Sequence, residues 1–314
     1  MAMDLIRSPR LVTGVTTIAS KSAGQRPWRI HFHRASYPIL HLFPFSSREV
    51  SARFQSGEKT VTPKVSQPAN VEIEFENEDE ECELVNGAEV SIGEGSDRIN
   101  AYLLKAVKNN NGAGILLLSD VYGYEDSSTR DFAYRVACNG YNVLVPDLFG
   151  GNPWGKHQEE ANYEAWISDQ DNFTNDVSSL AKSLSDFLGG SDGSAKKLGV
   201  IGICYGGGKA LELLSRDNGA LFGVGVFFYG IKMDPSLAPK VEAPILFIVG
   251  DNDPHCPVSQ IRSMEDTIQG SRAVVYRNRG HDFVHRPASP EEDEDAENAF
   301  AIMRNWLHDG LISR

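Results

Sequence analysis

The sequence predicts an α/β protein with a mostly parallel central sheet that helices cover on both faces. Short, continuous apolar runs such as 114–119 and 198–203 have the length of buried strands, and they alternate along the chain with amphipathic helical patterns. Apolar residues make up 41% of the chain, which is enough to fill a core of this kind. Strands and helices that alternate in this way build a sheet between two helical layers.

These patterns begin near residue 84 and continue to the end of the chain. Residues 88–92 and 99–106 alternate like half-buried strands and predict an antiparallel lead-in. Further strands are predicted at 114–119, 141–146, 198–203, 222–229, 245–249 and 273–276. Helices are predicted at 127–138, 171–188, 207–215, 258–268 and 289–308. The last helix has Ser289 as its N-cap, with Pro290 at the first helical position.

Residues 1–70 have a different composition, with ten Lys and Arg side chains, three acidic ones and many Ser and Thr. This is typical of an organelle transit peptide, whose partner would be the import machinery. A disordered basic tail that binds anionic surfaces is the alternative. The hydroxylated stretch 13–22 favours the chloroplast, whereas the aromatic, Arg-bearing stretch 28–45 favours the mitochondrion. Residues 71–83 form an acidic extension, and 84–314 form the folded domain.

Charge, hydropathy and cysteine spacing exclude several classes of protein. A net charge of −13 argues against a general nucleic-acid binder, which needs Lys and Arg to contact phosphates. The apolar runs are far shorter than the ~20 residues of a membrane span. The four cysteines include no CxxC pair, which argues against a zinc ribbon or a disulfide scaffold and favours a reducing compartment. The expected partner is a small-molecule substrate, and no metal or organic cofactor is implied.

Chemistry in a parallel sheet gathers beyond the carboxyl ends of its strands. Cys204 directly follows the predicted strand 198–203 and directly precedes a helix, between glycines on both sides. So sharp a turn strains the backbone, and a Cβ at the flanking positions would collide with neighbouring elements. This is a nucleophile elbow with cysteine in place of serine, and the helix N-terminus behind it favours a thiolate. A buried structural cysteine is the alternative.

Two further strand ends supply an acid and a base. Asp251 follows the strand 245–249 and is assigned to orient the base, whereas Asp253 is interpreted as a turn or cap residue. His281 lies in the loop after the last strand, where a general base can reach the nucleophile. The order of Cys204, Asp251 and His281 along the chain is that of an α/β-hydrolase triad.

The motifs at 202–207, 250–251 and 280–283 resemble those of the dienelactone hydrolase (carboxymethylenebutenolidase) family. The resemblance extends over roughly residues 84–310. It implies an α/β-hydrolase fold and the hydrolysis of an ester or lactone, with Cys204 as nucleophile, His281 as base and Asp251 as orienter. It also implies an oxyanion hole formed by the backbone N–H groups of Val121 and Tyr205.

This sequence departs from the family pattern at its substrate-binding positions. The best-known members have Glu, which interacts with the resting thiol, where this chain has Asp120, shorter by about 1.5 Å. They also bind the substrate carboxylate with two arginines. Arg286 is the candidate for one, and no match for the other lies near residues 157–166. Further expected substrate contacts are Tyr122, Trp154 and Phe283.

The sequence therefore leaves the substrate open between dienelactone and another lactone or ester. Two other functions also stay open. One is a hydrolase fold used as a small-molecule receptor without catalysis. The other is a thiol redox sensor that uses Cys204, although no resolving cysteine lies near it in the sequence. The oligomeric state is not predicted.

Overall fold

The computed structural model describes residues 85–93, 98–155, 163–172, 177–188 and 198–313. The transit segment predicted at 1–70 and the acidic extension at 71–83 lie outside the described residues. Among the described helices, none has the length and apolar character that a membrane crossing requires.

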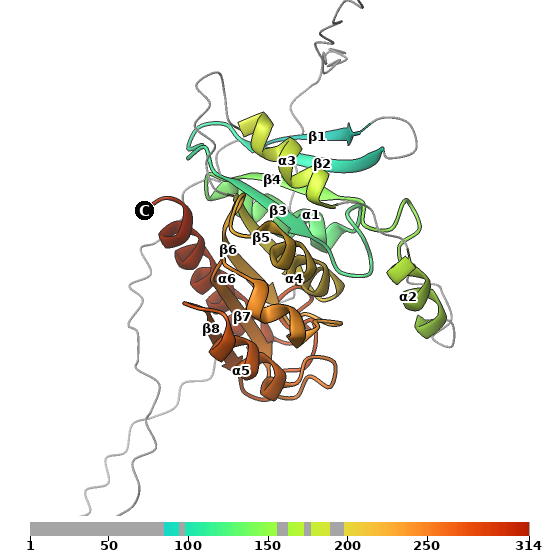
Figure 1. The fold of residues 1–314 in the computed structure, drawn as a ribbon, viewed down its shortest axis with the longest axis vertical. Helices are drawn as coiled ribbons and strands as arrows, with labels where there is room; N and C mark the ends of the chain where they lie inside the picture. Colours follow the sequence, from blue (N-terminus) through green and yellow to red (C-terminus); the bar gives the residue numbers. More distant parts are fainter. Residues whose placement is uncertain (1–84, 94–97, 156–162, 173–176, 189–197, 314) are drawn as a thin grey trace, which may run out of the picture. The chain divides into compact units, whose positions relative to one another are not determined.

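Within the described residues, eight strands form one sheet in the order β1-β2-β4-β3-β5-β6-β7-β8 (Figure 1). β1 pairs antiparallel with β2, and β2 pairs antiparallel with β4, whereas every later pairing is parallel. The predicted antiparallel lead-in to a mostly parallel sheet is confirmed. The strands are β1 (Val85–Ile92), β2 (Ile99–Ala106), β3 (Gly114–Leu118), β4 (Asn142–Pro146), β5 (Leu198–Ile203), β6 (Phe222–Phe228), β7 (Ile245–Gly250) and β8 (Arg272–Tyr276).

The central strands owe their position to their composition. Every residue of β3, β4, β5 and β7 is buried, as the continuous apolar runs predict. β1 lies at the edge of the sheet and is mostly exposed. Strands covered on both faces keep no polar alternation, because neither face of the sheet contacts water.

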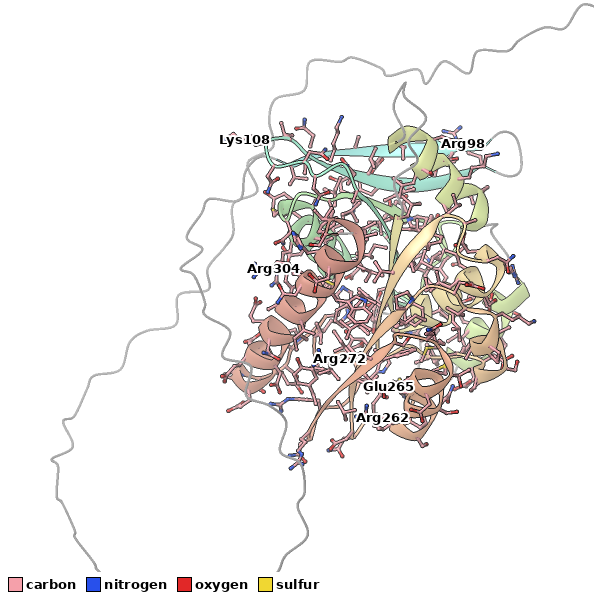
Figure 2. All side chains as sticks on the ribbon, turned by 60° about the vertical axis from the view of Figure 1, so that its left-hand side comes forward. Arg98, Lys108, Arg262, Glu265, Arg272 and Arg304 are labelled. Carbon is pink, nitrogen blue, oxygen red and sulfur yellow. The ribbon has the colours of Figure 1, made fainter. Side chains whose placement is uncertain are left out.

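Helices cover both faces of this sheet (Figure 2). α1 (Ser127–Cys138) and α6 (Pro290–Leu311) lie together on one face, where the rings of Phe132 and Phe300 meet edge to face with centroids 5.5 Å apart. α3 (Val177–Leu188) and α4 (Tyr205–Asp217) contact each other on the other face. α5 (Val258–Thr267) joins α4 through contacts with the 3₁₀ helix η4 (Pro235–Lys240).

The predicted elements differ from the structure in three places. The helix predicted at 171–188 is two helices, α2 (Tyr163–Asn172) and α3, and α2 was largely missed. α4 begins at Tyr205, two residues before its predicted start, and its first turn contains three consecutive glycines, which disfavour a helix in isolation. Cys138, at the end of α1, is disulfide-bonded, which the sequence analysis did not anticipate, whereas Cys204 and Cys256 are free.

Candidate active site

The loops that follow β3, β5, β7 and β8 bring the polar residues of the candidate site together. Asp120 follows β3, Cys204 follows β5, Asp253 follows β7 and His281 follows β8. All four strands run parallel in the sheet, so their carboxyl ends lie along the same edge.

Cys204 occupies a strained backbone conformation, with φ of 53° and ψ of −115°. Close packing against glycines permits this turn. A Cβ at Gly202 would lie 2.7 Å from the carbonyl oxygen of Gly206, and a Cβ at Gly207 would lie 2.5 Å from the Cα of Gly230. A Cβ at Gly206 would collide with the carbonyl of Leu118. The collisions expected around a nucleophile elbow are therefore present on both sides of Cys204.

The loop after β3 is held against this turn by backbone hydrogen bonds. The N–H of Gly206 donates to the carbonyl of Ser119 at 3.1 Å, so the start of α4 lies against the end of β3. Val121 follows two residues later, and its carbonyl accepts the N–H of Trp154 at 2.8 Å. Tyr205 opens α4, and its backbone N–H donates to the thiol of Cys204. Both predicted oxyanion donors thus belong to segments that pack beside the nucleophile elbow.

His281 forms a hydrogen bond with a buried acid. Its Nδ1 lies 2.7 Å from Oδ2 of Asp253, whose side chain is 0% exposed. Burial opposes ionisation of both groups, but their mutual hydrogen bond and charges outweigh it, and at His281 the charge of Asp282 acts in the same direction. The pKa of Asp253 is therefore lowered, and the pKa of His281 is raised above its ordinary value of 6.5. This contact fixes the ring so that Nε2 is the nitrogen left to exchange a proton.

The assignment of Asp251 as the orienting acid is wrong. Asp251 is exposed, and its Oδ1 accepts the backbone N–H of Asn278 at 2.6 Å, which ties together the loops after β7 and β8. Asp253 is a turn residue, as the sequence suggested, because its Oδ1 accepts the N–H of His255 at 2.8 Å. Its second oxygen contacts His281 at the same time. One carboxylate therefore closes the turn and orients the imidazole.

The thiol of Cys204 does not have the low pKa that its place before a helix suggested. Cys204 is only 5% exposed, and burial is the largest cause that raises its pKa well above the ordinary value. The charges of Asp282, Asp120 and Asp253 raise it further, while the N–H of Tyr205 lowers it. The resting side chain is therefore the neutral thiol.

Asp282 is a site residue that the sequence analysis missed. Its carboxylate, the thiol sulfur of Cys204 and a ring nitrogen of His281 lie within 4.8 Å of one another. Its Oδ1 lies 3.7 Å from Nε2 of His281. Asp282 has a φ of 64°, a left-handed conformation that few residues other than glycine adopt. The only sequence signal was its position next to the candidate base.

Asp120 and Arg286 are paired with protein groups. Nη2 of Arg286 lies 2.8 Å from Oδ2 of Asp120 and 2.8 Å from Oδ2 of Asp126, and Nη1 donates to Ser128 at 2.9 Å. Oδ2 of Asp120 also lies 3.2 Å from Nδ1 of His285. The side chain of Asp120 is 1% exposed. The structure thus places these two predicted substrate-binding residues in an internal ionic network.

The predicted aromatic contacts divide into two groups. Phe283 is 1% exposed and packs against Tyr276, so it is a core residue and the prediction that it lines the substrate site is wrong. Tyr122 is partly exposed, with the guanidinium carbon of Arg286 4.5 Å from its ring centroid. Trp154 contacts Tyr163 of α2 edge to face at 5.1 Å. Tyr163 was missed because α2 was not predicted.

Cys204, His281 and Asp282 also have the ligand types that a transition metal such as zinc uses. Their donor atoms are close enough to approach one ion. The same three groups can exchange protons, as nucleophilic catalysis by a thiol requires. The elbow, the His281–Asp253 pair and the parallel sheet together define an α/β-hydrolase.

Comparisons with known proteins identify the family within that class. The model of the dienelactone hydrolase family matches residues 99–311. A carboxymethylenebutenolidase homolog from Mus musculus is 27% identical over 233 residues, which cover 71% of this chain and 90% of the relative. The chain therefore belongs to the dienelactone hydrolase family, and it is a hydrolase of carboxylic esters or lactones.

Solved structures have the same fold. The dienelactone hydrolase from Anabaena variabilis ATCC 29413 aligns with a TM-score of 0.52 at 20% identity, over 72% of this chain and 99% of its own. A dienelactone hydrolase-like promiscuous phosphotriesterase from metagenomic libraries aligns with a TM-score of 0.56 at 18% identity, over the same shares of the two chains. At this identity the comparison establishes the fold alone.

The contact between His281 and Asp253 predicts the titration of the ring. Asp253→Asn should lower the pKa of His281 toward 6.5, because the charge and much of the hydrogen-bond strength are lost. In the wild type, the raised pKa stabilises the fold below pH 6.5, and this contribution is lost as the pH rises through the folded pKa. NMR titration of the ring protons measures the shift. Asp251→Asn is the matched control, and an equal shift there would contradict the assignment.

Proposed function

We propose that this hydrolase uses Cys204 as its nucleophile, His281 as general base and Asp253 as the residue that orients the imidazole. The observation that carries the proposal is the placement of a thiol at a strained strand-to-helix turn, within 4.8 Å of an imidazole whose other nitrogen is held by a buried carboxylate. The substrate is a carboxylic ester or lactone, and dienelactone, which carries a carboxylate, is the family substrate against which this class is tested.

The reaction begins with a neutral thiol. His281 removes the proton from Cys204, and the sulfur attacks the carbonyl carbon, whose oxygen becomes an oxyanion. The N–H groups of Tyr205 and Val121 stabilise this charge, and each such donor lowers the barrier by about 3 kcal/mol in other hydrolases. His281 then gives its proton to the leaving oxygen, and a thioester remains on Cys204.

Water completes the cycle. His281, again neutral, removes a proton from a water molecule that attacks the thioester carbonyl. The tetrahedral intermediate collapses, the carboxylic acid leaves and the thiolate recovers a proton from the imidazolium. Asp253 remains ionised throughout, because its role is to hold the ring and stabilise its positive charge. The chain needs no added electron donor or acceptor for these steps.

Two non-hydrolytic roles for Cys204 are alternatives to this proposal. A receptor without catalysis has no use for an imidazole that a buried acid orients, so the His281–Asp253 contact argues against it. A redox sensor would show reversible oxidation of Cys204 without turnover. The high pKa of the thiol makes it a slow target for oxidants, which argues against this role.

Removal of the nucleophile tests the proposal directly. Cys204→Ala should reduce hydrolysis of 4-nitrophenyl acetate by at least about 10³-fold, and should abolish whatever turnover of dienelactone the wild type has, measured under reducing conditions with the full chain. Cys256→Ala, which removes the other described free cysteine, is the matched control and should retain activity. Circular dichroism checks that both variants are folded. Full activity of Cys204→Ala would disprove its role, and hydrolysis of the simple ester alone would exclude dienelactone as substrate.

The two acids after β7 give a second test. Asp253→Asn should lower kcat by about 10²-fold or more, because the imidazole loses the acceptor that fixes its tautomer and stabilises its charge. Asp251→Asn should change kcat by less than about threefold, since its amide oxygen can still accept the N–H of Asn278. Steady-state kinetics of both variants measure the difference. The reverse order of effects would restore Asp251 as the orienting acid.

We also propose that residues 1–70 direct the protein into the chloroplast. Their basic, Ser- and Thr-rich and acid-poor composition supports import into an organelle. Residues 1–70 fused to a fluorescent protein should enter isolated chloroplasts and become protease-resistant there. Uptake by isolated mitochondria alone would support the alternative destination, and uptake by neither would support a basic tail with another role.

A further inference from the structure

We propose that Asp282 makes the acyl site of this hydrolase anionic and selects substrates whose acyl group carries no negative charge. The proposal rests on Cys204 as the reacting thiol. Asp282 would thus determine specificity. Compounds whose acyl group carries a carboxylate close to the reacting carbonyl would be excluded as substrates.

The position of Asp282 is fixed by its backbone. Its carbonyl accepts the N–H of His285 at 3.1 Å and the N–H of Arg286 at 2.8 Å, which form the turn after the base. The residue adopts its left-handed φ of 64° within this turn. The side chain is thereby held within 4.8 Å of the sulfur of Cys204. Its Oδ1 is buried and has no hydrogen-bond partner among the described residues.

The surrounding charges do not neutralise this carboxylate. The ionic groups around the thiol are the carboxylates of Asp120, Asp126, Asp253 and Asp282, the guanidinium of Arg286 and the imidazoles of His281, His285 and His255, the last with its ring centroid 5.5 Å from that of His281. Four carboxylates thus face one guanidinium and three imidazoles. The group carries a net negative charge unless all three imidazoles are protonated at once.

Arg286 is held by other partners. Its guanidinium contacts Asp120 and Asp126 at 2.8 Å each and donates to Ser128. A substrate carboxylate that bound Arg286 would have to displace one of these internal carboxylates. The residue that the family resemblance offered for anion binding is therefore already neutralised inside the protein.

The short distance between Asp282 and the reacting carbonyl makes the site selective for the charge of the substrate. A carbonyl attacked by Cys204 must approach the sulfur to about 3–3.5 Å. A charged group one or two atoms from that carbonyl then lies about 5–10 Å from Asp282, depending on which way the acyl chain points. Like charges at such separations in a partly buried site repel strongly enough to change a rate by at least about tenfold.

Two alkylating reagents of nearly the same size test the charge at the sulfur. Iodoacetamide is neutral and iodoacetate is anionic, and each forms a bond from the sulfur of Cys204 to its methylene carbon while iodide leaves. The full-length wild type should react with iodoacetamide at least about tenfold faster than with iodoacetate, after each rate is divided by that of N-acetylcysteine amide with the same reagent. Peptide mass spectrometry follows Cys204 separately from the other cysteines.

Asp282→Asn removes the charge and keeps the shape. It should raise the relative rate of iodoacetate by about tenfold, whatever it does to the absolute reactivity of the thiol. The reactions are run at pH 8 to keep the carboxylate ionised, because burial raises the pKa of Asp282. Asp282→Gly, which suits the left-handed backbone, is the second variant if the first does not fold. Asp309→Asn is the charge-matched control on α6, beside Tyr141 near the opposite, amino-terminal edge of β4.

The outcomes separate this inference from the proposed function. If the ratio of the normalised rates with iodoacetamide and iodoacetate is the same in the wild type, in Asp282→Asn and in the control, the inference is overturned. A change confined to the Asp282 variants would support it, even in a protein that hydrolyses none of the esters tested. If Cys204→Ala loses turnover but Asp282→Asn has the same ratio of reagent rates as the wild type, the proposed hydrolase mechanism is supported. In that case Asp282 does not determine selectivity.

Discussion

The close packing of glycine backbones around Cys204 is the constraint on which the site depends. Gly206 lies so close to the carbonyl of Leu118 that no side chain fits, and its N–H donates to Ser119 of the same segment. This contact sets the start of α4 against the end of β3. Because the thiol, both candidate oxyanion donors and the loop that carries Asp120 all belong to these two segments, their relative positions follow from one backbone approach.

Acidic residues then set the electrostatics of the site. Burial and three neighbouring carboxylates keep the thiol of Cys204 protonated, while Asp253 and Asp282 favour a charged His281. A neutral thiol reacts slowly with oxidants and alkylating agents. In the proposed mechanism the proton therefore leaves the sulfur as the carbonyl is attacked, when the developing charge moves away from these acids toward the oxyanion donors.

The sequence was sufficient for the features that local patterns determine. Buried strands, the elbow at Cys204 and the position of His281 were predicted, since each depends on a short run of residues. The choice between Asp251 and Asp253 was not, because both follow β7 and only the three-dimensional turn decides which one faces inward. The pairing of Arg286 with Asp126 depends on how the turn after β8 packs against the start of α1, and no short sequence motif predicts that packing.

Asp282 and Arg286 together explain why family membership does not settle the substrate. The fold and the nucleophile depend on backbone packing, which tolerates wide changes in the side chains around it. In the specificity that we propose, the net charge within a few ångström of the sulfur decides which acyl groups can approach, and a single carboxylate can change it. In this chain the arginine that could attract an anion is balanced by Asp120 and Asp126, while Asp282 remains beside the thiol. We therefore propose that a scaffold which serves a carboxylate-bearing lactone in one protein is suited by its charges to an uncharged ester or lactone in this one.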